Sequence, residues 1–395
     1  MNLRFLKNYQ KGNTRLVGEN LILETEFSKN KEELFPEVRY FIYDVNHNTR
    51  RELLPNIHKV APFRFIDATF YSEYIKYIYM FQYLAADEIF QMIRYGIDDG
   101  SIQIIYNYSC NIESLADKNI SFFILNDSNF LIQKEEKNEE DVLQNCRYFK
   151  YSSFLYNINE EKSYEVIDEN LISNGIETII PLNENNMIIK TGYNLLINQR
   201  YETLTKEEVA VEAISIVNTS QFISDIMIMQ NGIIMNALEQ SYFTQTLPRI
   251  MVQGEFLIFS KLDLETKSEM TFFYNHVTKE TCSCLSKNVT TIEKMSKPLL
   301  VGEIPYVRIN HANRTDFLNL QSKKIDISFG EEQHLDKVVN DLFLVTEERK
   351  KILGKHKYCI CFYKYPSLSL LHTEHANYTG CLYDDKTDTL YVYCE

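Results

Sequence analysis

The sequence has no run of roughly 18 consecutive apolar residues, the length that a membrane-spanning helix requires. Its first stretch, MNLRFLKNYQKGNTR, also has no apolar segment as long as that of a signal peptide. Positive charge is in short supply, with 41 Lys and Arg against 55 Asp and Glu and a formal net charge of −14. Because phosphate groups are bound by clustered Lys and Arg, we expect no nucleic-acid partner and no binding to a membrane surface.

Glycine and proline are scarce as well, at 12 and 8 of 395 residues. No segment rich in glycine, proline or serine divides the chain, which indicates a single domain over residues 1–395. Glycine-rich phosphate-binding loops and the G-x-S-x-G motif of hydrolases are both missing. A Ser/His/Asp triad stays open, because its members are distant in sequence.

The eight cysteines are thinly spread, and without a secretion signal this favours reduced thiols in a cytoplasmic protein. Four of them form two Cys-x-Cys pairs, Cys282 with Cys284 and Cys359 with Cys361. On a strand, the two members of such a pair face the same side. Four thiolates can bind Zn²⁺, but this is not the usual zinc spacing. We therefore expect the thiols to pack as small apolar groups, with no metal and no other cofactor.

What the sequence has in abundance is tyrosine and phenylalanine, at 27 and 24 residues, which suits half-buried strands. In YGIDDGSIQIIYNY (95–108), apolar alternation is interrupted by Asp-Asp-Gly and then resumes. This pattern predicts a strand, a tight turn and a second strand. Similar hairpin patterns surround Tyr43, Tyr156 and Tyr274.

A second strand–turn–strand pattern precedes these hairpins, for example at 120–133. The two patterns together predict four antiparallel strands in each unit, and the units recur at a spacing of roughly 50 residues. Between residues 64 and 108 the predicted strands are 64–70, 74–84, 88–97 and 101–108.

Tandem four-stranded antiparallel units build a β-propeller, and over nearly the whole chain the pattern resembles the β-propeller superfamily. Residues 365–393, with an Asp-rich turn between two strands, resemble propeller repeats especially closely. Since tryptophan and Gly-Gly pairs are absent, the WD, YWTD and kelch signatures are missing and no particular family is indicated. The resemblance implies an all-β propeller of about seven blades, with six or eight as alternatives, and short helical insertions.

Further details follow from aligning the units. A capping box predicts a helix at 204–217, and a second helix is an alternative to a strand in 334–350. The last hairpin, 379–384 with 389–394, is surplus to seven blades, and we expect it to complete the first blade by pairing with N-terminal strands. Innermost strands are predicted to begin near Arg15, Asp67, Ser121, Glu177, Asp225, Glu303 and Asp341.

Four acids fall at nearly the same place in this alignment, at or just before the start of an innermost strand: Asp67, Glu177, Asp225 and Glu303. If these strands line the axis, the carboxylates ring one mouth of a channel and attract a cation or a basic ligand. Paired acids can also serve glycoside hydrolysis. The alternative is that they are turn and capping acids, which accept hydrogen bonds from nearby backbone N–H groups.

Two other polar stretches are weaker candidates. His372, Glu374 and His375 resemble a ligand cluster, but they lack the helical spacing of a zinc motif, and we expect an exposed loop end. The basic run at 347–357 is expected to be a solvated loop, with a docking patch for an acidic partner as the alternative.

Taken together, these patterns favour a non-catalytic cytoplasmic propeller that acts as a ligand-binding or protein-binding module. The expected partner is a protein, a small molecule or a carbohydrate. One alternative is a carbohydrate-active enzyme, a glycoside hydrolase or lyase-like propeller, that uses the four acids. Another is a structural subunit of a larger assembly, which an exposed apolar patch would favour.

Overall fold

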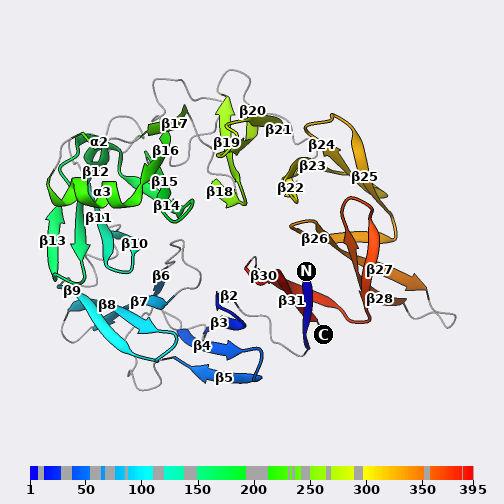
Figure 1. The fold of residues 1–395 in the computed structure, drawn as a ribbon, viewed down its shortest axis with the longest axis horizontal. Helices are drawn as coiled ribbons and strands as arrows, with labels where there is room; N and C mark the ends of the chain where they lie inside the picture. The colour runs from blue at the N-terminus through cyan, green and yellow to red at the C-terminus, as the bar shows by residue number, and fades with distance from the viewer. Residues whose placement is uncertain are drawn as a thin grey trace. The chain divides into compact units, whose positions relative to one another are not determined.

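The chain is a β-propeller of eight sheets (Figure 1), seven with four antiparallel strands and one with three. The predicted fold is therefore confirmed, but the blade number is eight and not seven. The computed structural model describes residues 1–7, 13–27, 38–53, 64–66, 76–84, 88–109, 120–137, 149–192, 212–229, 232–233, 236–241, 250–263, 268–288, 297–350, 356–384 and 386–394.

Each four-stranded sheet is formed by strands that follow one another in sequence. The first four sheets comprise β2 (Asn13–Gly18), β3 (Leu21–Phe27), β4 (Val38–Asp44) and β5 (Thr49–Glu52); β6 (Arg64–Ile66), β7 (Tyr77–Leu84), β8 (Ile89–Gly96) and β9 (Ile102–Ser109); β10 (Ile120–Asn126), β11 (Asn129–Lys137), β12 (Phe149–Asn157) and β13 (Lys162–Glu165); and β14 (Ile176–Pro181), β15 (Asn186–Thr191), β16 (Glu212–Asn218) and β17 (Asn236–Ser241).

The remaining sheets continue this order, except that the last one includes the first strand of the chain. They comprise β18 (Ile250–Gln253), β19 (Phe256–Asp263), β20 (Ser268–Asn275) and β21 (Thr281–Asn288); β22 (Lys297–Val301), β23 (Ile304–Asn310), β24 (Arg314–Asn319) and β25 (Ile325–Gly330); β26 (Gln333–Val339), β27 (Leu342–Lys350), β28 (His356–Lys364) and β29 (Ser369–Glu374); and β30 (Tyr378–Asp384), β31 (Thr389–Cys394) and β1 (Asn2–Lys7).

The sheets fall into two compact units. One unit holds the sheets that begin with β2, β6, β10 and β14, and the other holds those that begin with β18, β22, β26 and β30. The prediction of one domain over the whole chain stays a prediction. Among the described residues, neither helix approaches the length and apolar character that crossing a bilayer demands.

The second sheet confirms the strand pattern predicted from residues 64–108, since β6 to β9 follow the four predicted strands closely. The turn between β8 and β9 is stabilised by Asp99, whose Oδ1 accepts a hydrogen bond of 2.9 Å from the Ser101 N–H. Gly100 has a φ of 67°, which a glycine adopts without steric strain. The prediction of a tight turn at the Asp-Asp-Gly motif is therefore confirmed.

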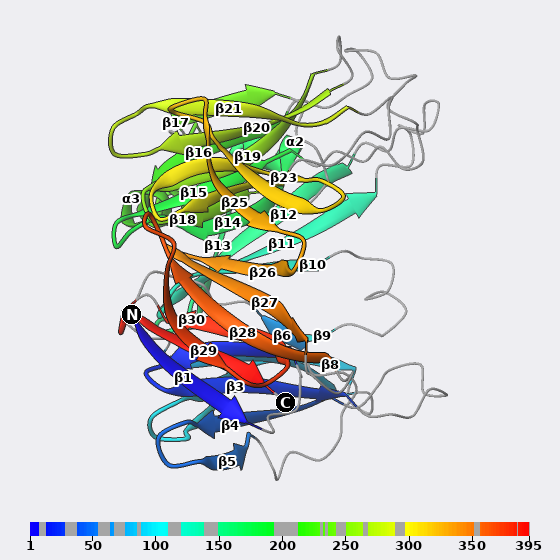
Figure 2. The same ribbon diagram turned by 90° about the vertical axis from the view of Figure 1, so that its right-hand side faces the viewer.

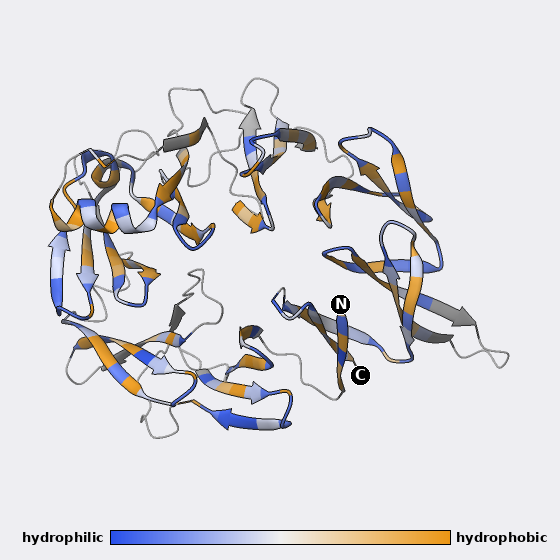
Figure 3. Ribbon diagram, viewed as in Figure 1, coloured by the Kyte–Doolittle hydropathy of each residue, from blue (hydrophilic) through white to orange (hydrophobic). Residues whose placement is uncertain are grey.

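Apolar side chains fill the space between neighbouring sheets of one unit. Phe343 of β27 lies 5.4 Å from Phe317 and 5.3 Å from Phe329, measured between ring centres. Phe317 and Phe329 belong to the preceding sheet, and all three rings are buried. Figure 3 shows the matching alternation of apolar and polar colour along the strands. Burial of one such ring stabilises the fold by about 1.5–3 kcal/mol.

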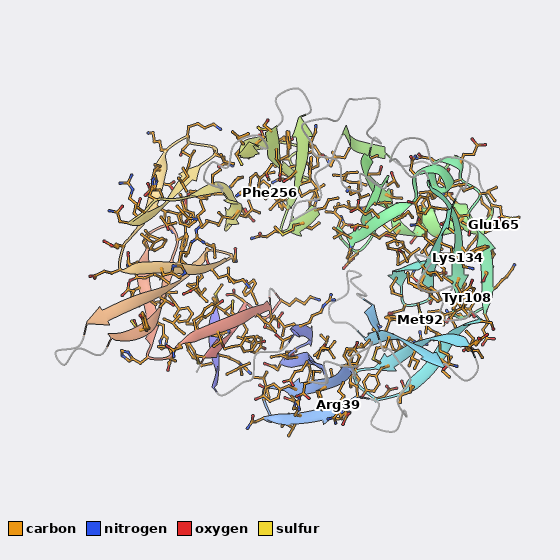
Figure 4. The ribbon with its side chains drawn as sticks, turned by 180° about the vertical axis from the view of Figure 1, so that it is seen from behind. Arg39, Met92, Tyr108, Lys134, Glu165 and Phe256 are labelled. Carbon is orange, nitrogen blue, oxygen red and sulfur yellow. The ribbon has the colours of Figure 1, made fainter. Side chains whose placement is uncertain are left out.

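Polar side chains also join neighbouring sheets in the first unit. The Lys134 ammonium of β11 lies 4.2 Å from the ring centre of Tyr108 on β9 (Figure 4). Gln133 is buried and makes two hydrogen bonds to the backbone of Ile176 at the start of β14. Its Nε2 donates to the Ile176 carbonyl at 2.8 Å, and its Oε1 accepts from the Ile176 N–H at 2.6 Å. The side-chain amide thus pairs with β14 as a neighbouring strand would.

The helices differ from those predicted. Residues 204–211 lie outside the described residues, but 212–217 of the predicted helix belong to β16, and 334–350 form β26 and β27. Conversely, the innermost strand that was predicted to begin near Asp225 is replaced there by helix α3 (Thr219–Met227). Asn218 caps this helix by accepting a hydrogen bond of 2.9 Å from the Gln221 N–H. The N-cap and the buried Phe222 and Ile226, four residues apart, favour a helix over the alternating strand.

Helix α2 (Glu169–Asn174) was not predicted. Its N-cap, Asp168, is buried, and its Oδ1 accepts a hydrogen bond of 3.0 Å from the Leu171 N–H. Its Oδ2 accepts from the N–H groups of Gly232 at 3.1 Å and Ile233 at 2.8 Å. One carboxylate therefore holds the start of a helix to a distant segment of the same unit.

The eighth sheet explains why the blade number exceeds the prediction. The last hairpin, β30 with β31, does pair with an N-terminal strand, β1, and Figures 1 and 2 show β1 beside this hairpin. However, these strands form a sheet of their own, while β2 to β5 already complete the first sheet. The hairpin was therefore wrongly counted as part of the first blade.

Candidate functional site

The four predicted acids have different structural settings. Glu177 lies in β14, as predicted, and forms a buried ion pair with Lys190 on the adjacent strand β15. Asp225 lies in helix α3 and not at the start of a strand, because the fifth sheet begins with β18. Its Oδ1 accepts a hydrogen bond of 2.6 Å from the Gln221 side chain.

The other two acids add nothing to a shared site in the described structure. Glu303 lies in the exposed turn between β22 and β23, and not at the start of an innermost strand. Asp67 lies outside the described residues. The alignment that placed Asp225 and Glu303 at equivalent positions is therefore wrong, while the ring of carboxylates at a channel mouth stays a prediction.

The two Cys-x-Cys pairs lie on different sheets. Cys282 and Cys284 are on β21 and half-buried, and Cys359 and Cys361 are on β28 and buried. The Sγ atoms of Cys359 and Cys361 are 3.8 Å apart, so the prediction that such a pair projects to one side of its strand is confirmed there. Burial raises the pKa of both Cys284 and Cys361 to about 12.

The histidine cluster near the C-terminus lies at a strand and not in a loop. His372 and Glu374 belong to β29, and their Nε2 and Oε2 atoms are 3.6 Å apart, as expected for residues on one face. The His372 ring centre lies 5.1 Å from that of Phe5 on β1. The loop assignment is therefore wrong for His372 and Glu374, which lie on a strand, while the expected exposure is confirmed for His372 and for His375, which follows the strand end.

Among the described residues, His311 lies near a serine and an aspartate, but in an order that does not suit catalysis. Asp316 is buried, and its Oδ1 accepts a hydrogen bond of 2.6 Å from the Ser328 hydroxyl. Its Oδ2 lies 3.0 Å from His311 Nε2. In a catalytic triad the imidazole stands between the hydroxyl and the carboxylate, whereas here the carboxylate is in the middle. In the part of the chain that the structure describes, no hydrogen bond joins a histidine ring to a hydroxyl or thiol.

The edge of β1 is the most distinctive functional candidate. β1 pairs with β31 in parallel, in the register Asn2↔Thr389 to Lys7↔Cys394, and the described residues give it no second partner strand. Leu6 is buried, and the Phe5 ring centre lies 5.8 Å from that of Phe362. The strand is thus firmly packed, while no described strand pairs with its other edge, which is called the open edge below.

The orientation of the β1 backbone follows from one hydrogen bond. The Asn2 N–H donates to the Asp388 carbonyl at 2.7 Å, on the side of β31. In a parallel pair, alternate residues direct both their N–H and C=O groups to the same neighbour. Leu3 and Phe5 therefore direct their backbone N–H and C=O groups toward the open edge. Sequence reasoning predicted a pairing of N-terminal strands with the last hairpin but missed this edge, because it did not define a separate eighth sheet.

No known protein family matches this sequence, and no curated protein matches it. Among solved structures, it is similar to dipeptidyl peptidase 4 of Porphyromonas gingivalis, with a TM-score of 0.49 and 9% identity over 93% of this chain and 54% of that chain. It is also similar to the β-propeller domain of the Trilobed protease from Pyrococcus furiosus, with a TM-score of 0.41 and 12% identity over 88% of this chain and 92% of that chain. For the acylaminoacyl peptidase of Pyrococcus horikoshii the TM-score is 0.43 and the identity 10%, over 97% of this chain and 64% of that chain.

These likenesses show the fold alone, and the chain spans about half the length of the dipeptidyl peptidase. The class of protein they define is the β-propeller. The expectation of a non-catalytic binding module is contradicted, because several of the propellers that the chain resembles are those of peptidases.

Proposed function

We propose that this chain is a propeller of the peptidase type, which receives a polypeptide in extended form at the open edge of β1. The observation that carries the proposal is the three-stranded eighth sheet. In the other seven sheets a fourth strand occupies the outermost position, which no described strand fills beyond β1. An extended peptide fits such a position, because it adds to a sheet through main-chain hydrogen bonds.

The chemistry of this edge sets the kind of peptide. The backbone groups of Leu3 and Phe5 supply donors and acceptors that do not depend on the sequence of the bound peptide. The net charge of −14 favours the approach of basic over acidic peptides. The expected ligand is therefore an unstructured, basic polypeptide.

Within such a peptidase, the propeller would receive the peptide and a separate catalytic domain or subunit would cleave it. This division of labour is supported by the order of Ser328, Asp316 and His311, in which the imidazole does not contact the hydroxyl. It is also supported by the absence of a G-x-S-x-G motif from the whole sequence.

A proline substitution tests the edge. Because proline lacks an N–H group, Leu3→Pro loses the N–H that points toward the open edge. The backbone hydrogen bonds of Asn2 and Arg4 toward β31 are retained. Leu3→Ala is the matched control, since it shortens the side chain but keeps the N–H. Binding is measured by fluorescence anisotropy of a labelled, unstructured basic peptide, and melting temperatures are recorded for both variants.

We expect Leu3→Pro to weaken peptide binding by about 5- to 10-fold relative to Leu3→Ala, which corresponds to roughly one net hydrogen bond. Equal binding by both variants, or no binding by the wild type, would contradict the peptide site. Hydrolysis of the peptide by the purified chain, detected by mass spectrometry, would contradict the separate catalytic partner.

We further propose a cytoplasmic location. The support is the six cysteines in the described residues that form no disulfide bond, although the Sγ atoms of Cys359 and Cys361 are only 3.8 Å apart. Reduced thiols of this kind are typical of a reducing compartment. Thiol labelling of the protein in intact and lysed cells tests this, and a protein labelled by an impermeant reagent in intact cells contradicts it.

A further inference from the structure

Two thiols and a carboxylate meet on one face of the seventh sheet. Glu347 of β27 lies opposite Cys359 of β28 in the strand register, and Cys361 follows two residues later on the same face. One ligand atom from each residue lies within 4.8 Å of the other two. Both thiols are buried, so their surroundings are fixed by the packing of the sheet.

The geometry of this cluster matches that of tetrahedral zinc. With Zn–S bonds of about 2.3 Å at the tetrahedral angle, two sulfur ligands are separated by about 3.8 Å. The Sγ atoms of Cys359 and Cys361 are 3.8 Å apart. A Zn–O bond of about 2.0 Å would place the carboxylate oxygen about 3.5 Å from each sulfur. Because the ligand atoms already lie within 4.8 Å of one another, a shift of the Glu347 carboxylate by at most about 1.3 Å reaches this distance.

Polar neighbours orient the carboxylate. Gln333 Nε2 donates a hydrogen bond of 2.9 Å to Glu347 Oε1, and the Tyr363 hydroxyl donates to the same oxygen. On the other side of the cluster, the Thr373 hydroxyl lies 3.8 Å from Cys361 Sγ. Metal-binding carboxylates are commonly held by such outer hydrogen bonds, and a water molecule completes four-fold coordination where the protein supplies three ligands.

We propose that Glu347, Cys359 and Cys361 bind a zinc ion as its three protein ligands, with water in the fourth position. This differs from the expectation that both Cys-x-Cys pairs pack as apolar groups. Carboxylate and thiolate together select zinc over magnesium or calcium, which prefer oxygen ligands alone. The site is independent of the peptide edge at β1.

The other Cys-x-Cys pair provides an internal control. Cys282 and Cys284 have the same spacing on β21, but no further His, Cys, Asp or Glu joins them in the described part of the chain. Two thiolates alone form an incomplete zinc site. The proposal therefore distinguishes two pairs that are equivalent in sequence.

The test uses the full chain, purified without chelators, incubated with zinc and desalted. The amount of zinc bound per protein chain is then measured by elemental mass spectrometry. We expect about one zinc per chain in the wild type and in Cys282→Ser/Cys284→Ser, and almost none in Cys359→Ser/Cys361→Ser. Gln333→Leu should weaken zinc binding by about 10- to 100-fold in competition with a chelator, since it removes an outer hydrogen bond to Glu347.

A second measurement does not depend on the stability of the Cys359 and Cys361 variants. Cobalt is added to the Cys282→Ser/Cys284→Ser protein, and near-ultraviolet absorption is recorded. A thiolate-to-cobalt charge-transfer band supports the site. Absence of this band, a metal-free wild type, or equal zinc in both double variants overturns the proposal.

Discussion

Gln133 offers the sharpest test of how neighbouring sheets are joined. In Gln133→Leu, the N–H and C=O groups of Ile176 both lose the partner that the wild-type amide supplies. An unpaired buried polar group costs about 1–3 kcal/mol, so two cost about 2–6 kcal/mol. We expect the free energy of unfolding of the unit that holds β11 and β14 to fall by this amount.

Gln133→Glu distinguishes hydrogen bonding from packing, because its side chain has nearly the same shape. The protonated carboxyl can donate to the Ile176 carbonyl and accept from the Ile176 N–H, whereas the carboxylate can only accept. Burial next to a carbonyl raises the folded-state pKa of the new carboxyl above its unfolded value of about 4.3. The variant should therefore be close to wild type below that value. It should lose up to about 1.4 kcal/mol per pH unit as the pH rises toward the raised pKa.

The assay is urea denaturation of wild type, Gln133→Leu and Gln133→Glu at a series of pH values between about 4 and 8. The deficit of Gln133→Leu relative to wild type should be independent of pH, while that of Gln133→Glu should grow with pH and then level off. A Gln133→Leu deficit below about 1 kcal/mol, or a pH-independent Gln133→Glu deficit, would refute the reasoning.

Two further predictions concern buried carboxylates. Asp168→Ala should destabilise its unit by about 2–5 kcal/mol in urea denaturation, since it removes a helix cap and two buried hydrogen bonds, and Asp168→Asn should lose less. The hydrogen bond from Ser328, followed by the charges of Arg314 and His311, lowers the pKa of Asp316. The ionised Asp316 carboxylate therefore stabilises the folded state above its unfolded pKa of about 4. This stabilisation is lost as the pH falls through the lowered pKa of the folded state. Ser328→Ala should move that loss to higher pH, and an unchanged Asp316 titration by NMR would contradict this assignment.

The sequence predicted those parts of the fold that depend on local pattern. Strands β6 to β9 follow from alternation and one Asp-Asp-Gly turn, because antiparallel hairpins pair neighbouring residues. The prediction failed at α3, where an alternating run also satisfies helical spacing after an N-cap. It also failed at the eighth sheet, since the pairing of Asn2 with Thr389 has no local signal.

The candidate sites show the same limit. The shared face of Cys359 and Cys361 follows from strand periodicity, so the sequence indicated it. The addition of Glu347 depends on the register between β27 and β28, which the sequence pattern does not fix. Likewise, the pairing of Glu177 with Lys190 is set by the arrangement of β14 and β15 and not by either residue alone.

The parallel pairing of β1 with β31 has a consequence for synthesis of the chain. Within this chain β1 is made before the other strands, but its partner strand is made only after the other seven sheets have been translated. Until then β1 is an exposed strand that can pair with β31 of another copy. At high concentration, refolding should therefore yield some dimers in which two chains have exchanged their first strands.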